Sequence, residues 1–208
     1  EFEKSEENHL QYLSSCKWSD LKAHNLIQNQ LKDKNFNLQM GNSTSVRYIQ
    51  LFKQQKDLKY NSNRGVSGID GSSSTAVGAA SVTDELTVLI TGDLSFIYDQ
   101  HALWNKQIPK NLKIIVVNNQ GGGIFNIISG PKTTPYSKEF FETRHEISLE
   151  KIAATFKINY QKATNEIQAA KCLNNIFMSK DAEIIELFTG NIENENVLND
   201  YFRNIKKD

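Results

Sequence analysis

Two oxygen-bearing side chains, one carboxylate and one amide, stand beyond two aliphatic runs of the sequence, separated from them by one or two residues. Asp93 follows the run 86–90 within Thr-Gly-Asp-Leu-Ser, and Asn119 follows the run 112–117 within Val-Asn-Asn-Gln. Three glycines (121–123) come next, and without a Cβ they let a backbone approach a phosphate or a metal closely. Magnesium is a hard cation that takes such oxygen ligands and usually keeps phosphate and water oxygens besides. Residue types and spacing therefore predict a cation and phosphate site shared by two strand ends.

The order of segments indicates how those strand ends are positioned. Runs with strand character alternate with segments whose apolar residues follow helical spacing. The runs at 86–90 and 112–117 are typical of strands buried on both faces of a parallel sheet. The pattern predicts an α/β fold, a three-layer α/β/α arrangement around a mostly parallel six-stranded sheet. The expected strands are 36–40, 58–61, 86–90, 112–117, 158–161 and 183–188. The expected helices are 20–31, one that begins after Ser43, one through 75–80, 96–104, 149–156, 167–177 and 195–205.

Polar, glycine-containing segments follow four of these strands. They are 41–47, 61–71, 91–95 and 118–125. Ligands of open parallel sheets sit at the carboxyl ends of the strands, so four such segments on one edge predict a site there. Ser19 and Ser43 are predicted N-caps of the two helices that they precede.

Composition excludes several classes of function. Lysine plus arginine and aspartate plus glutamate are equal at 24 each, so no basic face for nucleic acid is expected. No apolar run approaches the ~20 residues of a membrane span. Cys16 and Cys172 have neither zinc-site nor disulfide spacing, which favours reduced thiols and a cytoplasmic location.

Two segments lie outside the predicted sheet and helices. The first residues, 1–7, are charged, with neither an initiator methionine nor the apolar core of a signal peptide, as expected at the edge of a longer protein. We therefore interpret 1–17 as a linker from an upstream domain and 18–208 as one domain. The polar stretch 129–146 is predicted to be a mobile loop, since a loop this long inside a compact domain usually forms a lid or a docking segment.

The Gly-Asp and Asn-Asn pairs, about one βαβ unit apart, resemble the diphosphate-binding signature of thiamine-diphosphate-dependent enzymes. In that family the matching Asp, the matching Asn and the carbonyl two residues after it hold Mg²⁺ (or Mn²⁺) against the cofactor. The resemblance implies Asp93, Asn119 and Gly121 as metal ligands. It also implies that Ile69 supports the bent form of the cofactor. The implied cofactor contacts are Ile69, Asp93, Leu94, Ser95, Asn119, Gly121, Gly122 and Ile124.

Further motifs are similar to one branch of this family. Leu94 stands where the family usually has glycine, and the run Val-Val-Asn-Asn-x-Gly-Gly-Gly-Ile-Phe follows it. Gly-Asn-Ser at 41–43 with Arg47, and Asn-Arg-Gly through Ile-Asp-Gly at 63–71, agree. These segments resemble the 2-succinyl-5-enolpyruvyl-6-hydroxy-3-cyclohexene-1-carboxylate synthases of menaquinone biosynthesis. The resemblance runs from about Trp18 to the C-terminus and corresponds only to their C-terminal, diphosphate-binding domain.

The branch implies a carbon–carbon bond-forming transferase that decarboxylates 2-oxoglutarate and adds the succinyl unit to isochorismate. Both substrates carry carboxylates, and a planar guanidinium binds a carboxylate in bidentate fashion. The resemblance makes Ser43, Arg47, Arg64 and Phe125 the expected substrate contacts. It also implies an activating glutamate from a pyrimidine-binding domain, normally of the partner subunit, in a homo-oligomer. We find no candidate for that glutamate here, so this chain alone is expected to be inactive and to bind cofactor weakly.

Alternatives follow from the same residues. Asp93 and Asn119 could serve only as a helix cap and a turn residue. Arg64 could be a surface arginine and Ile69 a core residue, as most residues of their types are. His145 is interpreted as a solvated loop histidine. The rival functions are another 2-oxo-acid thiamine-diphosphate enzyme, such as an acetolactate synthase or a decarboxylase, and a non-catalytic α/β binding domain. A dinucleotide-binding domain is weaker, because no G-x-G-x-x-G follows the first strand.

Overall fold

The computed structural model describes residues 2–32, 34–56, 58–126, 130, 133–190 and 193–206. Within these ranges, strands and helices alternate around one sheet, as predicted. The strands are β1 (Asn37–Met40), β2 (Lys59–Ser62), β3 (Thr87–Gly92), β4 (Leu112–Asn118), β5 (Asn159–Ala163) and β6 (Glu183–Phe188). The helices include α2 (Asp20–Leu31), α3 (Thr44–Ile49), α4 (Ser72–Ser81), α5 (Asp93–Tyr98), α6 (Leu149–Thr155), α7 (Glu166–Ile176) and α8 (Asn194–Asn204).

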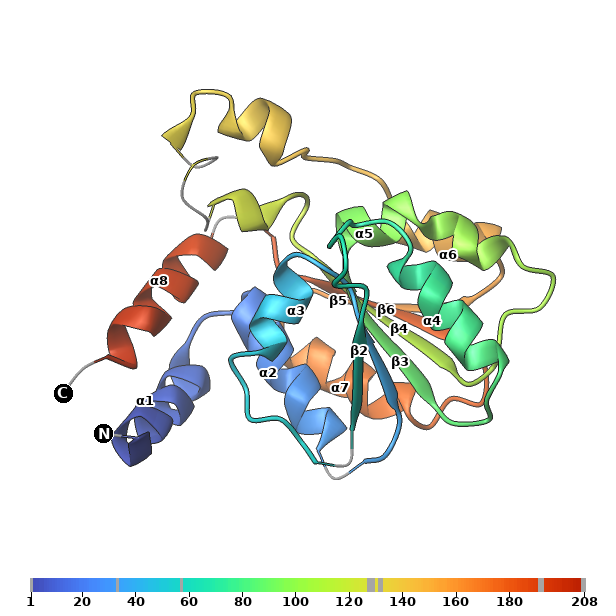
Figure 1. Ribbon diagram of the computed structural model, residues 1–208, viewed down its shortest axis with the longest axis horizontal. Coiled ribbons are helices and arrows are strands. Elements are labelled where there is room, and N and C mark those ends of the chain that lie inside the picture. The colour runs from blue at the N-terminus through green and yellow to red at the C-terminus, as the bar shows by residue number, and fades with distance from the viewer. Residues whose placement is uncertain are drawn as a thin grey trace.

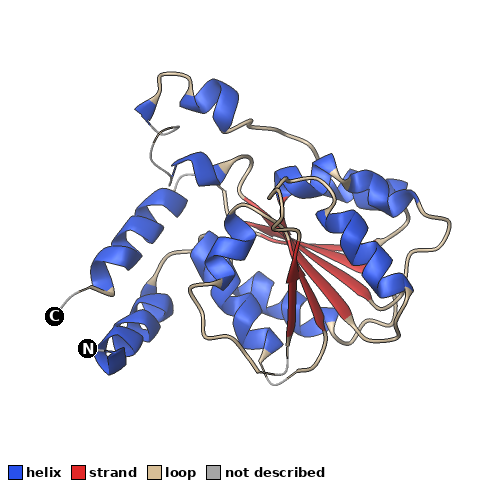
Figure 2. Cartoon of the chain, viewed as in Figure 1, coloured by secondary structure: helices blue, strands red, loops and turns tan. Residues whose placement is uncertain are grey.

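Every strand pairing in the six-stranded sheet is parallel, and the strand order is β2-β1-β3-β4-β6-β5. Helices α2, α3 and α7 cover one face and α4, α5 and α6 cover the other (Figures 1 and 2). Neighbouring residues of one strand serve the two faces: Val88 and Ile90 pack with α2, α3 and α7, and Leu89 packs with α4 and α6. The three-layer α/β/α prediction is confirmed.

The strand order places a topological switch point between β1 and β3. From β1 the chain crosses to β2 on one side, and from β3 it crosses to β4 on the other side. The segments that leave β1 and β3 therefore diverge and leave a crevice at the carboxyl ends of these strands. Open α/β sheets bind their ligands at such a point.

The predicted helix 96–104 is two helices, α5 and a 3-10 helix η1 (Gln100–Trp104). Asp99 lies between them and is 1% exposed. Its carboxylate accepts hydrogen bonds from the Ser74 backbone N–H at 2.8 Å and from Ser74 Oγ at 2.6 Å. These bonds satisfy an orphan donor at the start of α4 and tie the two segments together.

The predicted linker 1–17 contains a helix, α1 (Phe2–Ser15), that lies beside α8 at one end of the molecule (Figure 1). Tyr12 donates its hydroxyl to the Val197 carbonyl at 2.8 Å, and His9 Nδ1 lies 2.8 Å from the Tyr201 hydroxyl. Leu13 joins a small third core here with residues of α8. That another domain precedes this helix stays a prediction.

The predicted loop 129–146 contains one turn of π-helix, Ser137–Phe141. Its end docks on the glycine segment, because the Gly122 N–H donates to the Glu142 carbonyl at 2.5 Å. Residues 129, 131 and 132 lie outside the described residues, and the mobility of this loop stays a prediction. No described helix is both long enough and apolar enough to cross a membrane.

Candidate cofactor and metal site

A cavity of about 490 Å³ opens at the carboxyl ends of β1, β3 and β4, where the switch point lies. Its volume is within the range of small-molecule and cofactor sites, about 300–1,000 Å³. Most of the residues predicted to bind cofactor meet in its wall. The predicted residues in the lining are Ser43, Ile69, Asp93, Leu94, Ser95, Gly121, Gly122, Ile124 and Phe125.

Asp93 joins the ends of β3 and β4. Its side chain is 3% exposed, and its Oδ2 accepts the Gly121 backbone N–H at 2.8 Å. The same oxygen lies 2.9 Å from His145 Nε2. The side chain of His145 is only 9% exposed, so its interpretation as a solvated loop histidine is wrong. The segment after the π-helix carries this imidazole into the cavity, where it contacts the proposed metal ligand.

Asn119 lies behind the cavity wall and is 3% exposed. Its Nδ2 donates to Asp20 Oδ2 at 2.8 Å, whereas its Oδ1 has no hydrogen-bond partner. Buried polar atoms are nearly always paired, so an unpaired amide oxygen needs an explanation, such as a bound cation.

Asp20 is the first residue of α2 and is 2% exposed. Its Oδ1 accepts the Thr189 hydroxyl at 2.5 Å. Burial raises the pKa of Asp20 to about 6, hydrogen bonds from Thr189 and Asn119 act against this rise, and the charge of Asp93 adds to it. Two carboxylates thus influence each other at this end of the sheet.

The negative charge and the oxygen atoms of this region fit a divalent cation. Asp93 and Asp20 are buried carboxylates, and no lysine or arginine forms an ion pair with either of them within the described ranges. The unpaired Asn119 oxygen adds a neutral ligand of the kind that hard cations bind. No group of three or more His, Cys, Asp or Glu among the described residues could hold a metal. A cation here would therefore need amide, carbonyl and phosphate oxygens, as Mg²⁺ commonly does.

The triple glycine is required by close contacts within the chain. Gly121 has φ +148°, and a Cβ there would collide with the Glu142 carbonyl oxygen. A Cβ on Gly123 would lie 2.6 Å from Asn119 Nδ2. The prediction that these glycines admit a phosphate stays a prediction. In this structure Gly121 allows the backbone of residue 142 to approach closely, and Gly123 does the same for the Asn119 amide.

Ser43 shows backbone strain at the cavity. It precedes α3 with φ 71° and ψ −125°, and its side chain makes no capping hydrogen bond. The prediction that it caps this helix through its side chain is wrong, whereas Ser19 does accept from the Lys22 N–H. Strain of this kind costs on the order of 1–3 kcal/mol and clusters at functional sites. Ser43 lines the cavity, as a substrate contact should.

The two predicted arginines lie beside the cavity rather than in its lining. Arg64 is exposed, and its Nη1 donates to Asn42 Oδ1 at 3.1 Å. Arg47 donates from Nη1 to the Ser43 carbonyl at 2.9 Å and lines a separate cavity of about 110 Å³. Each arginine is therefore held by a residue of the cavity wall, Asn42 or Ser43. Their contact with substrate stays a prediction.

Apolar residues form the remaining wall. Ile69 is 37% exposed, and its carbonyl accepts the Ser95 hydroxyl at 2.6 Å, which ties the 61–71 loop to α5. The Phe125 ring meets Phe141 edge to face, with 5.4 Å between centroids. Ile124 is 7% exposed, so only part of it can contact a ligand. The arrangement offers an exposed aliphatic side chain and an aromatic pair around the polar residues.

Sequence reasoning missed three residues of the site. Asp20, Asn42 and His145 were assigned no role, yet each bonds to a predicted site residue. Asn42 also donates to the carbonyls of Asn63 and Gly68, which joins the segments after β1 and β2. The motif that contains Asn42 was a usable signal, whereas Asp20 has no local one.

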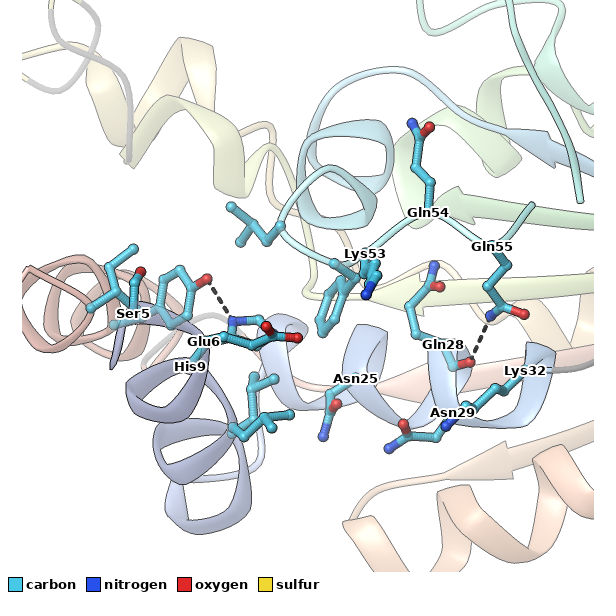
Figure 3. A pocket seen from close by; sticks show the side chains of 16 residues that line it. Ser5, Glu6, His9, Asn25, Gln28, Asn29, Lys32, Lys53, Gln54 and Gln55 are labelled. Carbon is cyan, nitrogen blue, oxygen red and sulfur yellow. Dashed lines mark hydrogen bonds between the residues drawn. The ribbon is translucent and has the colours of Figure 1, made fainter. Parts of the chain in front are cut away.

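A second cavity, of about 560 Å³, lies far from these residues, between α1, α2, the segment 51–55 and α8. Figure 3 shows His9 and Gln28 on different walls of it, with His9 hydrogen-bonded to a residue of α8. Burial lowers the pKa of His9. None of the predicted site residues lines this cavity.

The parallel α/β fold, with Asp93 and Asn119 at the ends of two neighbouring strands, is typical of a cofactor-binding domain. The sequence profile of thiamine pyrophosphate enzymes, C-terminal TPP binding domain, matches residues 39–187. This chain belongs to that family. Thiamine diphosphate is therefore the cofactor of the domain, and its predicted contacts surround the cavity described above.

More specific likeness comes from curated relatives. Proteins named 2-succinyl-5-enolpyruvyl-6-hydroxy-3-cyclohexene-1-carboxylate synthase from Christiangramia forsetii and Flavobacterium johnsoniae are 43% identical over 98% and 94% of this chain. The chain spans 35% of the length of these relatives.

Solved structures support the fold alone. A benzoylformate decarboxylase from Polynucleobacter necessarius superposes with a TM-score of 0.68 at 11% identity, over 83% of this chain and 33% of that one. A 4-hydroxybenzoylformate decarboxylase from Rhodococcus jostii gives 0.67 at 19% identity, over 85% and 33%.

Proposed function

We propose that this chain is the C-terminal, cofactor-binding domain of a menaquinone-pathway synthase that decarboxylates 2-oxoglutarate and adds the succinyl unit to isochorismate. The observation that carries the proposal is the 43% identity to synthases of that name along nearly the whole chain. The unpaired Asn119 oxygen and the Asp93 carboxylate, which follow the neighbouring strands β4 and β3, support it, because a retained ligand pair argues against a domain that has lost its chemistry.

In this function Asp93, Asn119 and the Gly121 carbonyl hold Mg²⁺ (or Mn²⁺), which binds the cofactor diphosphate. The bound cofactor supplies the carbanion chemistry that decarboxylates a 2-oxo acid, and the protein supplies orientation and electrostatics. The backbone of Leu94 and Ser95 lies in the first turn of α5 and would contact the diphosphate from there. Ile69, Gly122 and Ile124 complete the cofactor contacts from the apolar side. His145 has to leave Asp93 Oδ2 if a cation is to take that oxygen.

The substrate carboxylates go to the arginine side of the site. Arg64 is exposed next to Asn42, and Arg47 is exposed on α3 above Ser43. Guanidinium groups bind carboxylates in a fixed bidentate geometry and keep their charge. Phe125 forms an apolar wall for the carbon skeleton. We assign 2-oxoglutarate and isochorismate to this region.

The remaining parts of the active site come from outside these 208 residues. The activating glutamate is expected in a pyrimidine-binding domain of the partner subunit, so we propose that the full-length protein is a homo-oligomer. We also propose a cytoplasmic location. The exposed Ile69 and Tyr98 beside the cavity are suited to contact such a domain. The chain by itself should show no synthase turnover.

The test uses the full-length protein. Calorimetry should show thiamine diphosphate binding only when Mg²⁺ or Mn²⁺ is present. With 2-oxoglutarate and isochorismate together, the succinylated cyclohexene product should form, detected by mass spectrometry. Pyruvate and benzoylformate, offered in parallel, test the rival 2-oxo-acid enzymes. Turnover of pyruvate in preference to 2-oxoglutarate would replace the proposal with the acetolactate synthase or decarboxylase alternative. Absence of metal-dependent cofactor binding would leave a non-catalytic domain.

A further inference from the structure

An asparagine can bind a cation through only one end of its side chain. The Asn119 amide carries an oxygen that can ligate and an NH₂ group that repels cations, and the two ends have nearly the same shape. A half-turn of the amide would present the wrong end. Something besides the residue type must therefore fix its orientation.

Asp20 is placed to do this. An ionised carboxylate only accepts hydrogen bonds, so it selects the NH₂ end of a neighbouring amide. Asp20 Oδ2 accepts Asn119 Nδ2 at 2.8 Å, and the Asn119 oxygen is left unpaired. The pairing spans 99 residues of sequence and is fully buried.

The carboxylate of Asp20 is itself held firmly. Its Oδ1 accepts the Thr189 hydroxyl at 2.5 Å, and its own N–H donates to Asn194 Oδ1 at 2.7 Å. Asn194 in turn donates to the Gly190 carbonyl at 2.6 Å. Asp20 also begins α2, whose N-terminus favours a negative charge. The group that orients Asn119 has little freedom to move.

We infer that Asp20 is a positioning residue for the cation: it never touches the ion, but it fixes the Asn119 amide with its oxygen toward the metal. This inference rests on the proposed function for the presence of the cation and goes beyond it in naming the residue that makes Asn119 a competent ligand. Hydrogen-bond partners of metal ligands typically contribute 10–100-fold to metal affinity.

The first test is a Mg²⁺ titration of full-length protein at saturating thiamine diphosphate, followed by tryptophan fluorescence. Asp20→Ala should raise the Kd for Mg²⁺ by ~10-fold or more. Asp20→Asn should stay within about threefold, because its amide oxygen can still accept from Asn119 while its NH₂ donates to Thr189. The Kd for thiamine diphosphate at saturating Mg²⁺ should move less than the Kd for Mg²⁺.

The second test exchanges the side chains of Asp20 and Asn119. Unlike Asp20→Ala, this exchange leaves no cavity. Asn119→Asp alone places two carboxylates within hydrogen-bond distance, so Mg²⁺ binding should weaken. Adding Asp20→Asn supplies an NH₂ donor to the new carboxylate, whose other oxygen then faces the cation. The double variant should bind Mg²⁺ at least ~10-fold better than Asn119→Asp alone. A structural role for Asp20 predicts no such recovery.

Glu186→Gln is the matched control. Glu186 is another buried carboxylate that accepts an asparagine NH₂, from Asn118 at 2.9 Å, but neither residue is a proposed ligand. It should lower the unfolding temperature without changing the Kd for Mg²⁺. The inference is overturned if Asp20→Ala binds Mg²⁺ within twofold of Glu186→Gln, or if the double variant shows no recovery. Wild-type protein without metal-dependent cofactor binding would instead overturn the proposed function.

Discussion

Asn118 and Asn119, adjacent residues at the end of β4, form the same kind of contact through their NH₂ groups but differ in whether their side-chain oxygens are paired. Each is almost fully buried, and each donates its NH₂ group to a buried carboxylate, Glu186 or Asp20. The Asn118 oxygen also accepts the Gln120 N–H at 2.9 Å, so both ends of that amide are paired. The Asn119 oxygen has no partner.

The carboxylates differ in the same way. Glu186 has Lys162 at 3.3 Å and the Tyr160 hydroxyl as partners. Burial, and after it the hydrogen bond to Glu186, raises the pKa of Tyr160 well above its usual value. Among the residues described, Asp20 has neutral hydrogen-bond partners, and the charge that affects its pKa is the negative Asp93. The Glu186 pair is complete, whereas the Asp20 pair lacks one positive charge and one partner for an oxygen. A bound divalent cation would supply both.

An unpaired atom alone does not mark a site. His24 Nε2 is also buried without a partner, but its ring stacks on Tyr48, with 4.9 Å between centroids, and no described carboxylate pairs with it. Burial lowers the pKa of His24 to about 4. The distinguishing feature of Asn119 is the combination of an unpaired oxygen with uncompensated negative charge.

Removing the charged ligand should have the largest effect. Asp93→Ala in the full-length protein takes away the carboxylate that accepts the Gly121 N–H, so cation-dependent thiamine diphosphate binding should fall by about 100-fold or more. Calorimetry with and without Mg²⁺ measures this loss. Asp99→Asn changes a buried carboxylate whose partners, Ser74 and His101, are not proposed site residues, so it should leave the affinity unchanged. Equal affinity in both variants would remove Asp93 from the metal site.

Displacing the Asn119 amide without changing it should have the next largest effect. The Cβ of Gly123→Ala would lie 2.6 Å from Asn119 Nδ2 and push the amide off its Asp20 contact. We expect the Kd for Mg²⁺ to rise ~10-fold, the lower end for loss of a supporting contact. Gly78→Ala, which meets nothing within 4 Å, is the control. Unchanged Mg²⁺ affinity in Gly123→Ala would show that the amide orientation does not matter.

Changing the substrate side should leave the cation pair intact. Arg64→Lys keeps the charge but loses the bidentate fork, so KM for 2-oxoglutarate or isochorismate should rise several-fold, about 1 kcal/mol of binding. Cofactor affinity should change less. Arg203→Lys on α8, which alters an exposed pair with Asp200, should change neither. If KM for both substrates stays at the wild-type value, Arg64 is no substrate contact.

The smallest effect on the site is expected from His24→Phe, which should leave Mg²⁺ affinity at neutral pH unchanged. The substitution should instead change the stability of the folded protein at acidic pH. The neutral His24 of the folded chain has a pKa near 4, below its ordinary 6.5, so the unfolded chain binds the proton first. Wild-type stability should therefore fall as pH drops from about 6.5 toward 4, by up to about 3 kcal/mol.

Urea unfolding of the two proteins between pH 7 and pH 4 measures this difference. His24→Phe should lose less stability over that range than the wild type. A change in Mg²⁺ affinity with His24→Phe at neutral pH would contradict the conclusion that only the unpaired atom of Asn119, and not that of His24, belongs to the metal site.

Local sequence patterns were sufficient to predict the strands of the sheet and the site residues that follow them. The aliphatic run 112–117 predicted β4 although it contains Lys113, which is 1% exposed and reaches the Ser179 carbonyl at 3.0 Å. Asp93 and Asn119 were predicted because each directly follows a strand, and parallel strands end at one edge.

Contacts between distant segments were not predictable from local patterns. The break of the helix at Asp99 depends on Ser74, 25 residues earlier. The bond between Asp20 and Asn119 spans 99 residues, and that between His145 and Asp93 spans 52. Propensity and spacing describe neighbours along the chain, whereas these side chains meet only after the sheet and its helices have assembled.

The pairing of α1 with α8 has a mechanical consequence. His9 meets Tyr201 and Tyr12 meets Val197, so the two helices run antiparallel, with the start of α1 and the end of α8 at the same side (Figure 1). A force that pulls the ends apart loads these contacts one after another, as in opening a zipper. The helix pair should therefore yield at low force, and the six strands should bear tension only after both helices have detached.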